Sequence, residues 1–255
     1  MRVARWRTCA RRAAVATGLG LIGVVACAQP ATPPGWICGS FSRSDRLPPE
    51  DYRKPSPRLK VVENFHFGPN VEALVRPMQR GMALGSDLDF TLWGYPNHHR
   101  ALAALIRLAA REKTDQPAGA SFTVDCYFER AFMIAPDDVV ARMLYASYLG
   151  GGRRQPEALA QLKMVVDQAG DNPLTHFNAG LVYVEIGAYE EAAAQARRAA
   201  ELGYPRDTLV QELQRRGKWQ GPPLSASVAA SSASAPLPGP ASAPPPAGPA
   251  DRASR

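Results

Sequence analysis

The sequence is poor in the residues and motifs that catalysis and metal binding usually require. Its 255 residues include four cysteines and four histidines. No HExxH or paired CxxC motif supplies metal-ligand spacing, and no GxSxG or SxxK motif supplies an activated serine. We therefore expect a protein that is not an enzyme and has no cofactor and no bound metal.

Beyond its first residues, the chain also lacks a strong excess of one charge. The net charge of +7 comes from 30 basic and 23 acidic residues, and the opening MRVARWRTCARR holds five arginines and no acid. Without these five arginines the balance is 25 against 23, or +2. The high isoelectric point therefore gives no reason to expect a nucleic-acid-binding protein.

Long apolar runs are scarce, and the main one, Ala13–Ala26, directly follows this cationic start. A basic start, an apolar stretch and small residues at its end are typical of an export signal, and this stretch is short for a membrane span. We expect residues 1–28 to be a signal peptide. VVAC ending at Cys27 fits lipidation of Cys27, whereas the ACA around it fits ordinary cleavage before Gln29. The protein is then periplasmic, either soluble or anchored to the outer membrane as a lipoprotein.

Processing leaves two cysteines in the mature chain, Cys38 and Cys126. An even pair in an oxidising compartment predicts a disulfide bond between them. The alternative is that Cys126 is a buried free thiol, since it stands beside Tyr127 and Phe128 on an apolar helix face.

Residues 29–96 should form an N-terminal arm and a small helical segment. The β-branched and aromatic residues of Arg58–Phe67 favour a short strand or an extended strap. Pro69 suits the first position of a helix, which Pro77 should end or bend. At the other end, Pro205–Trp219 places Leu209 and Leu213 on one side of a helix. Residues 220–255 are rich in proline, alanine and serine, so we expect a disordered tail.

Between these ends the sequence repeats itself at a fixed spacing. Small or turn-forming residues pair across it: Ala146 with Gly180 (180 − 146 = 34), Ala158 with Ala192, and Asp171 with Pro205. A period of this length is typical of helix–turn–helix repeats. The segment HHRALAALIRLAAR, a long loop at 112–119 and FTVDCYFERAFMIAPDD read as an earlier, irregular repeat.

The second copy resembles the tetratricopeptide repeat (TPR) family. The matching consensus positions are Gly180, Tyr183, Gly187, Tyr189, Ala192 and Ala199. The segments VENFHF, DLDFTLWGYPNHHRAL and CYFERA, followed by these repeats, resemble a group of exported bacterial TPR proteins. The resemblance implies an all-α TPR-type solenoid of about three repeats over 97–219, with Pro205–Trp219 as its capping helix.

In this family the first helix of each repeat lines a concave groove that binds peptides or helices. The resemblance therefore implies a protein-binding groove formed by Val140, Met143, Ser147, Phe177, Asn178, Leu181 and Glu185. These residues suit an apolar segment, with Phe177 as its anchor. We expect an exported scaffold or adaptor that binds another envelope protein or peptide. In the alternative, the arm at Val61–Phe67 or another repeat covers some of these residues.

A second functional hypothesis rests on the segment DLDFTLWGYPNHH, which would make the protein a periplasmic ligand- or metal-binding protein. Its possible ligands are Asp87, Asp89, His98 and His99. Neighbouring residues on a helix diverge by about 100°, so both histidines are poorly placed to bind one ion. The simpler interpretation is that the aspartates cap a short turn, while Asn97 caps a helix that begins at His98.

The run Gly150–Arg154, GGGRR, invites comparison with an anion-binding loop. It lies between two repeat helices, no strand precedes it, and no Lys-Ser/Thr follows it. We interpret it as a flexible connection with solvated arginines.

Overall fold

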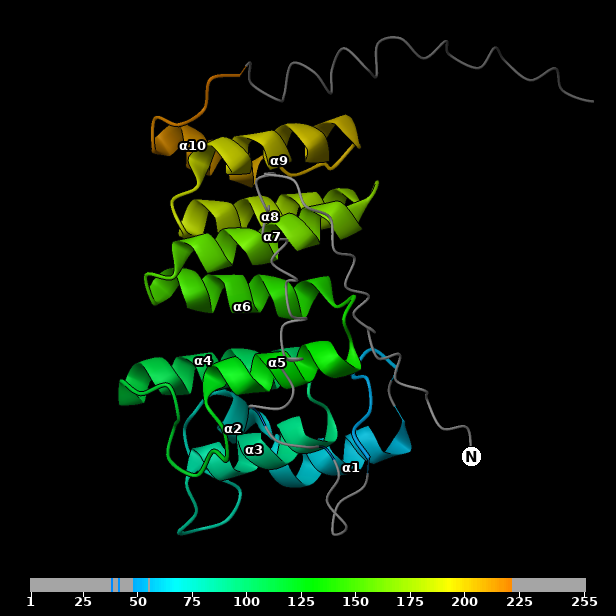
Figure 1. The fold of residues 1–255 in the computed structure, drawn as a ribbon, viewed down its shortest axis with the longest axis vertical. Coiled ribbons are helices and arrows are strands. Elements are labelled where there is room, and N and C mark those ends of the chain that lie inside the picture. The colour runs from blue at the N-terminus through cyan, green and yellow to red at the C-terminus, as the bar shows by residue number, and fades with distance from the viewer. Residues whose placement is uncertain (1–37, 39–40, 42–47, 55, 222–255) are drawn as a thin grey trace, which may run out of the picture. The chain divides into compact units, whose positions relative to one another are not determined.

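The structure is a computed structural model that describes residues 38, 41, 48–54 and 56–221 (Figure 1). Within these ranges the regular elements are all α-helices, which confirms the all-α class. They are α1 (Pro57–His66), α2 (Pro69–Glu72), α3 (Leu84–Gly94), α4 (His99–Glu112), α5 (Val124–Ile134), α6 (Val139–Gly151), α7 (Gln155–Ala169), α8 (Pro173–Glu185), α9 (Tyr189–Glu201) and α10 (Thr208–Arg215). The signal peptide, Cys27 and the tail from residue 222 lie outside the described residues.

Two helix pairs, α6 with α7 and α8 with α9, follow the period of the sequence. The first helices begin at Val139 and Pro173 (173 − 139 = 34), and the second helices at Gln155 and Tyr189 (189 − 155 = 34). The helices of each pair pack along one another, and α6 also packs on α8 (Figure 1).

Capping residues obey the same period. The side chain of Asp138 accepts hydrogen bonds from the backbone N–H groups of Val140 and Ala141 at the start of α6. Asn172, one period later in the chain (172 − 138 = 34), caps α8 in the same way. Each cap satisfies backbone donors that the first helical turn leaves without a partner, and this fixes where each repeat begins.

The pair α4 and α5 departs from the period. The first helices α4 and α6 are offset by more than one period (139 − 99 = 40), whereas the second helices α5 and α7 are offset by less (155 − 124 = 31). The difference lies in the connection, where Lys113 ends α4 in the left-handed conformation with φ of 55°. At Gly119, a Cβ atom would lie 2.3 Å from the Ser86 Oγ. The long loop therefore packs tightly against α3.

The segment Arg58–Phe67 is not the strand that its composition predicts, since it forms most of α1. Pro57 occupies the first turn of this helix, where its missing N–H costs nothing. Leu59 and Val62, three residues apart, are buried in a cluster with Tyr95. A helix places these two side chains on one face, and burial of that face outweighs the β propensity of the segment.

The prediction for the next segment is also partly wrong. Pro69 does begin a helix, but α2 ends at Glu72, and Leu74 adopts a left-handed φ of 57° well before Pro77. The segment around Asp87 and Asp89 is not a short turn but the helix α3. Helix α3 packs against both α1 and α4.

Asn97 does not cap α4 as predicted. His98 takes that role, and its Nδ1 accepts a hydrogen bond from the Ala101 N–H at 3.2 Å. The buried amide of Asn97 joins three chain segments instead. It donates to Asp51 (2.7 Å) and Asp138 (2.8 Å) and accepts from the backbone N–H of Tyr52 (2.8 Å).

A continuous apolar core runs from Phe67, at the end of α1, to Leu213 in α10. Helix α10 buries Leu209 and Leu213 against the last repeat, as its pattern predicts, and contacts both α8 and α9. None of the helices in the described ranges combines the length and apolar character needed to span a bilayer.

Cys38 and Cys126 form the predicted disulfide, with their Cα atoms 5.0 Å apart. The alternative of a free thiol at Cys126 is therefore wrong. The bond joins the segment that precedes α1 to the first turn of α5. The Arg130 guanidinium adds a second tie, because it donates to the Cys38 carbonyl oxygen at 3.1 Å.

Candidate functional site

The residues predicted to form the groove lie on α6 and α8, which pack on each other. Val140 and Ser147 are seven residues apart on α6, and Leu181 and Glu185 are four apart on α8. Both spacings place side chains on one side of a helix. Ser147 Oγ donates a 2.6 Å hydrogen bond to Glu185 Oε1. The two helices therefore present part of the predicted set as one surface.

The residues predicted to form the groove differ in how far their side chains are exposed. Val140 is 39% exposed and Leu181 is 38% exposed, so both apolar side chains reach the surface. Asn178 and Ser147 are partly exposed, and Met143 is buried.

Phe177, the predicted anchor, is 5% exposed, and its ring lies 4.5 Å from the ring of Tyr204 between centroids. Its side chain therefore packs inside the array rather than standing at the surface.

Leu174 belongs to this surface but is absent from the predicted set. It is 49% exposed, lies seven residues before Leu181 on α8, and stands one repeat period after Val140 (174 − 140 = 34). The repeat period itself is the signal that could find it. The exposed apolar side chains Val140, Leu174 and Leu181, together with Ser147 and Glu185, are called the α6–α8 surface below.

In the Gly150–Arg154 segment Arg153 is exposed as predicted, but Arg154 is not simply solvated. Gly150 and Gly151 still belong to α6, and Arg154 Nη1 lies 2.8 Å from both carboxylate oxygens of Asp125 in α5. The hydroxyl of Tyr145 donates to the same carboxylate at 2.7 Å. These contacts link α5, α6 and α7, so the segment helps to hold these three helices together.

The aspartates and histidines of the DLDFTLWGYPNHH segment do not converge. His98 Nε2 lies 3.1 Å from Glu63 Oε1, whereas His99 Nε2 lies 2.8 Å from Asp138. His98 is fully buried, and this desolvation lowers its pKa despite the hydrogen bond to Glu63. Because Nδ1 of His98 accepts from a backbone N–H, the ring proton is on Nε2 and is donated to Glu63.

The carboxylates of Asp87 and Asp89 line a pocket of about 270 Å³ together with His66 and Phe90. All four of their oxygens already accept hydrogen bonds within the fold. The donors are the Met78 N–H and His66 for Asp87, and the Tyr127 hydroxyl and the Ser121 N–H and hydroxyl for Asp89. Burial, followed by the charge of Asp89, raises the pKa of Tyr127, so this hydroxyl keeps its proton. The two aspartates thus tie α3 to its neighbours.

One group of potential metal ligands does meet geometrically in the described part of the chain. Cys38, Cys126 and Glu129 have ligand atoms within 4.8 Å of one another. Because the two sulfurs are bonded to each other, they offer no thiolate, which is the form that binds zinc.

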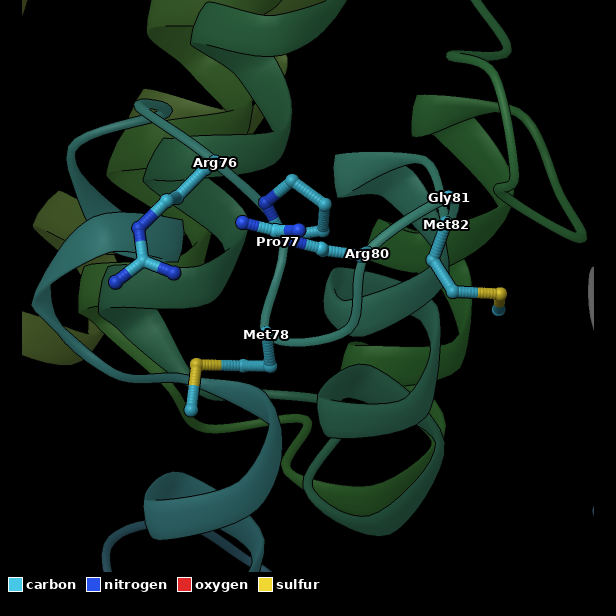
Figure 2. A pocket seen from close by; sticks show the side chains of 6 residues that line it. All are labelled: Arg76, Pro77, Met78, Arg80, Gly81 and Met82. Carbon is cyan, nitrogen blue, oxygen red and sulfur yellow. The ribbon is translucent and has the colours of Figure 1, made fainter.

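The loop between α2 and α3 forms a separate pocket of about 510 Å³ (Figure 2). Its lining combines two arginines and two methionines: Arg76, Met78, Arg80 and Met82. Figure 2 shows the side chains of Met78 and Met82 pointing away from each other on opposite sides of the loop. The run RPMQRGM at 76–82 carries this combination in the sequence, but no periodicity indicates that it forms a pocket.

The chain matches no family model, and no curated protein or solved structure matches it.

Proposed function

We propose that the protein is an exported tetratricopeptide repeat scaffold, with about three repeats, that binds an apolar segment of another envelope protein on its α6–α8 surface. The observation that carries this proposal is the repeated exposure of large apolar side chains at equivalent positions. Val140 and Leu174 stand one repeat period apart, and Leu181 extends the same face of α8 by two helical turns.

The chemistry of this surface suits a helical or extended partner. Leu174 and Leu181 have the seven-residue spacing with which a helix presents a continuous apolar stripe. Ser147 and Glu185 supply polar groups at one end of that stripe. These side chains are 38–49% exposed, so burying what remains exposed contributes about 0.5–1.5 kcal/mol each, which suits a reversible complex.

The compartment is inferred from the N-terminal signal and from the disulfide. A bond between Cys38 and Cys126 is stable in an oxidising compartment, and the periplasm is one. The protein then works in the periplasm, either soluble or held at the outer membrane through a lipid on Cys27.

Two observations favour the scaffold over ligand binding by the DLDFTLWGYPNHH segment. His98 and His99 pair with different carboxylates, and the oxygens of Asp87 and Asp89 are engaged within the fold. These groups hold α1, α3 and α4 together, which is a structural use of the segment.

Site-specific photo-crosslinking in bacterial cells tests the proposal. A photoreactive phenylalanine analogue replaces Leu174 or Leu181, and Lys163, which is exposed on α7, serves as the matched control position. We expect one discrete adduct from 174 and 181 and none from 163. The same adduct pattern at all three positions, or no adduct from 174 and 181 in exported protein, would contradict the proposal.

A further inference from the structure

The Cys38–Cys126 disulfide is asymmetric in its accessibility. Cys38 is 1% exposed, whereas Cys126 is only partly buried and lies in the first turn of α5. The rate of thiol–disulfide exchange depends on which sulfur an incoming thiolate can reach. Cys126 is therefore the more accessible residue of the pair, and attack on its sulfur would release Cys38.

Each cysteine also has a neighbour that suits it to this role. The first turn of a helix stabilises a thiolate, which suits Cys126 to leave as a thiolate when a mixed disulfide on it is resolved. On the other side of the bond, Glu129 Oε2 lies 2.8 Å from Cys38 Sγ. A disulfide sulfur carries no proton, so this contact is a hydrogen bond only when Glu129 is protonated and donates to the sulfur.

The surroundings of Glu129 favour its protonated form. Burial and, secondarily, the negative charge of Asp125 raise the pKa of Glu129. The charge of Asp125 is itself engaged by Arg154 from α7. The nearby guanidinium of Arg130 binds the Cys38 carbonyl oxygen.

We propose that Cys38–Cys126 is an exchange-reactive disulfide whose substrate is a dithiol, with Cys126 as the attacked sulfur and Glu129 as the proton donor to Cys38. A thiolate of the dithiol forms a bond to Cys126 Sγ, and the Cys38–Cys126 bond breaks. Its electron pair leaves on Cys38 Sγ, which takes the proton of Glu129 and becomes a thiol.

The second thiol of the substrate completes the reaction. It loses its proton to water and attacks the sulfur of the substrate that is bonded to Cys126, which releases Cys126 as a thiolate. The dithiol is oxidised to a disulfide, and the Cys38–Cys126 pair is reduced by two electrons. This reaction also frees the segment that carries Cys38 from its covalent link to α5.

Exchange kinetics on the full mature chain in its oxidised form test this site. Dithiothreitol is the dithiol, the pH is mildly acid, and loss of the disulfide is followed by acid quench and mass spectrometry. Glu129→Gln keeps the shape of the side chain but has no acidic proton, and Glu201→Gln on α9 is the matched control. We expect Glu129→Gln to slow exchange by about tenfold or more, and Glu201→Gln to leave it unchanged.

Mapping the intermediate tests the direction of attack in the unsubstituted protein. Glutathione, a monothiol, is added, free thiols are alkylated, and the peptides are sequenced by mass spectrometry. We expect glutathione on Cys126 and the alkyl group on Cys38. An adduct found mainly on Cys38 would overturn the proposal, as would an equal or faster exchange rate for Glu129→Gln with unchanged helicity. If Glu129→Gln loses helicity, Glu129→Asp replaces it in the kinetic test. The shorter side chain moves the carboxyl group away from Cys38 Sγ, so the same slower exchange is expected.

Discussion

Gly180 of α8 lies directly beneath Leu209 of α10, so closely that a Cβ atom on Gly180 would sit 2.3 Å from Leu209 Cδ2. The structure shows why this position has no room for a side chain. The capping helix rests on the bare backbone of α8. The end of the array therefore depends on a residue that has no side chain.

Gly180→Ala should destabilise the protein despite the better helix propensity of alanine. Overpacking costs about 1–3 kcal/mol, whereas the propensity gain in a helix interior is about 0.5–1 kcal/mol. The free energy of unfolding, measured with urea, should fall by about 1 kcal/mol.

Gly151→Ala is the control for this change, because a Cβ atom there meets nothing within 4 Å. It should leave the free energy of unfolding equal or slightly higher. Equal stability of both variants would mean that α10 shifts away from α8 without loss.

Removing the disulfide should lower stability substantially. Cys38 and Cys126 are 88 positions apart, and closing a loop of this length stabilises the folded state by about 3–5 kcal/mol in the chain-entropy model. Cys38→Ser should therefore lower the free energy of unfolding by that amount, which urea denaturation measures as a lower midpoint. A count of two free thiols in the denatured, unreduced, non-lipidated protein would show that the bond does not form.

The repeats could be predicted from sequence because local and long-range signals agree there. Asp138 and Asn172 are good helix caps, they stand one repeat period apart, and each precedes an apolar helix that packs on its neighbour. Where every level of the pattern points to the same structure, the pattern is sufficient. Phe177 shows the limit, since the period places it on a first helix but does not reveal that Tyr204 covers its ring.

The sequence-based predictions that proved wrong concern residues whose structure is decided by a partner distant in the sequence. Val62 of α1 is buried with Tyr95, and this contact selects a helix for a segment with strand-like composition. Asn97 binds Asp51 and Asp138, so its capping propensity is overridden by contacts with residues far away in the chain. Arg154 likewise finds Asp125 of another helix rather than solvent. No local pattern contains these pairings.

Stability should fall as the pH drops below about 6.5, through His98. Burial lowers the pKa of His98 in the folded protein from its ordinary value of 6.5. The unfolded chain therefore binds the proton first, so the contribution of neutral His98 is complete above this pH and is lost as the pH falls. The slope should approach at most about 1.4 kcal/mol per pH unit.

His98→Asn isolates this effect, because asparagine can still cap α4 but does not titrate. The difference in unfolding free energy between the two proteins should shrink as the pH is lowered from about 7.5 to 5.5. A difference that stays constant over this range would show that His98 takes up its proton equally well in both states.

The link between Arg154 and Asp125 should be measurable as a coupling between repeats. The pair is only partly buried, with side-chain exposures of 36% and 31%, so solvent screening limits its strength. A double-mutant cycle with Arg154→Ala and Asp125→Ala should give a coupling free energy of about 0.5–1 kcal/mol. A coupling near zero would mean that the contacts of Tyr145 and Glu157 take over from the pair.

Binding at the α6–α8 surface should depend on Leu181 rather than on Phe177 alone. Leu181→Asp places a charge at the end of the apolar stripe beside Glu185 and should weaken partner recovery by about 5-fold or more, because the burial of the exposed part of Leu181 is lost and a charge would have to be desolvated. Helicity should be unchanged, since the side chain is already 38% exposed. Met133→Asp is the control, as Met133 is equally apolar and 50% exposed on α5.

Phe177→Ala should instead lower the melting temperature, because its ring is packed against Tyr204. Equal recovery for Leu181→Asp and the unsubstituted protein, with the fold intact, would exclude this surface and direct the search to the arginine–methionine loop between α2 and α3.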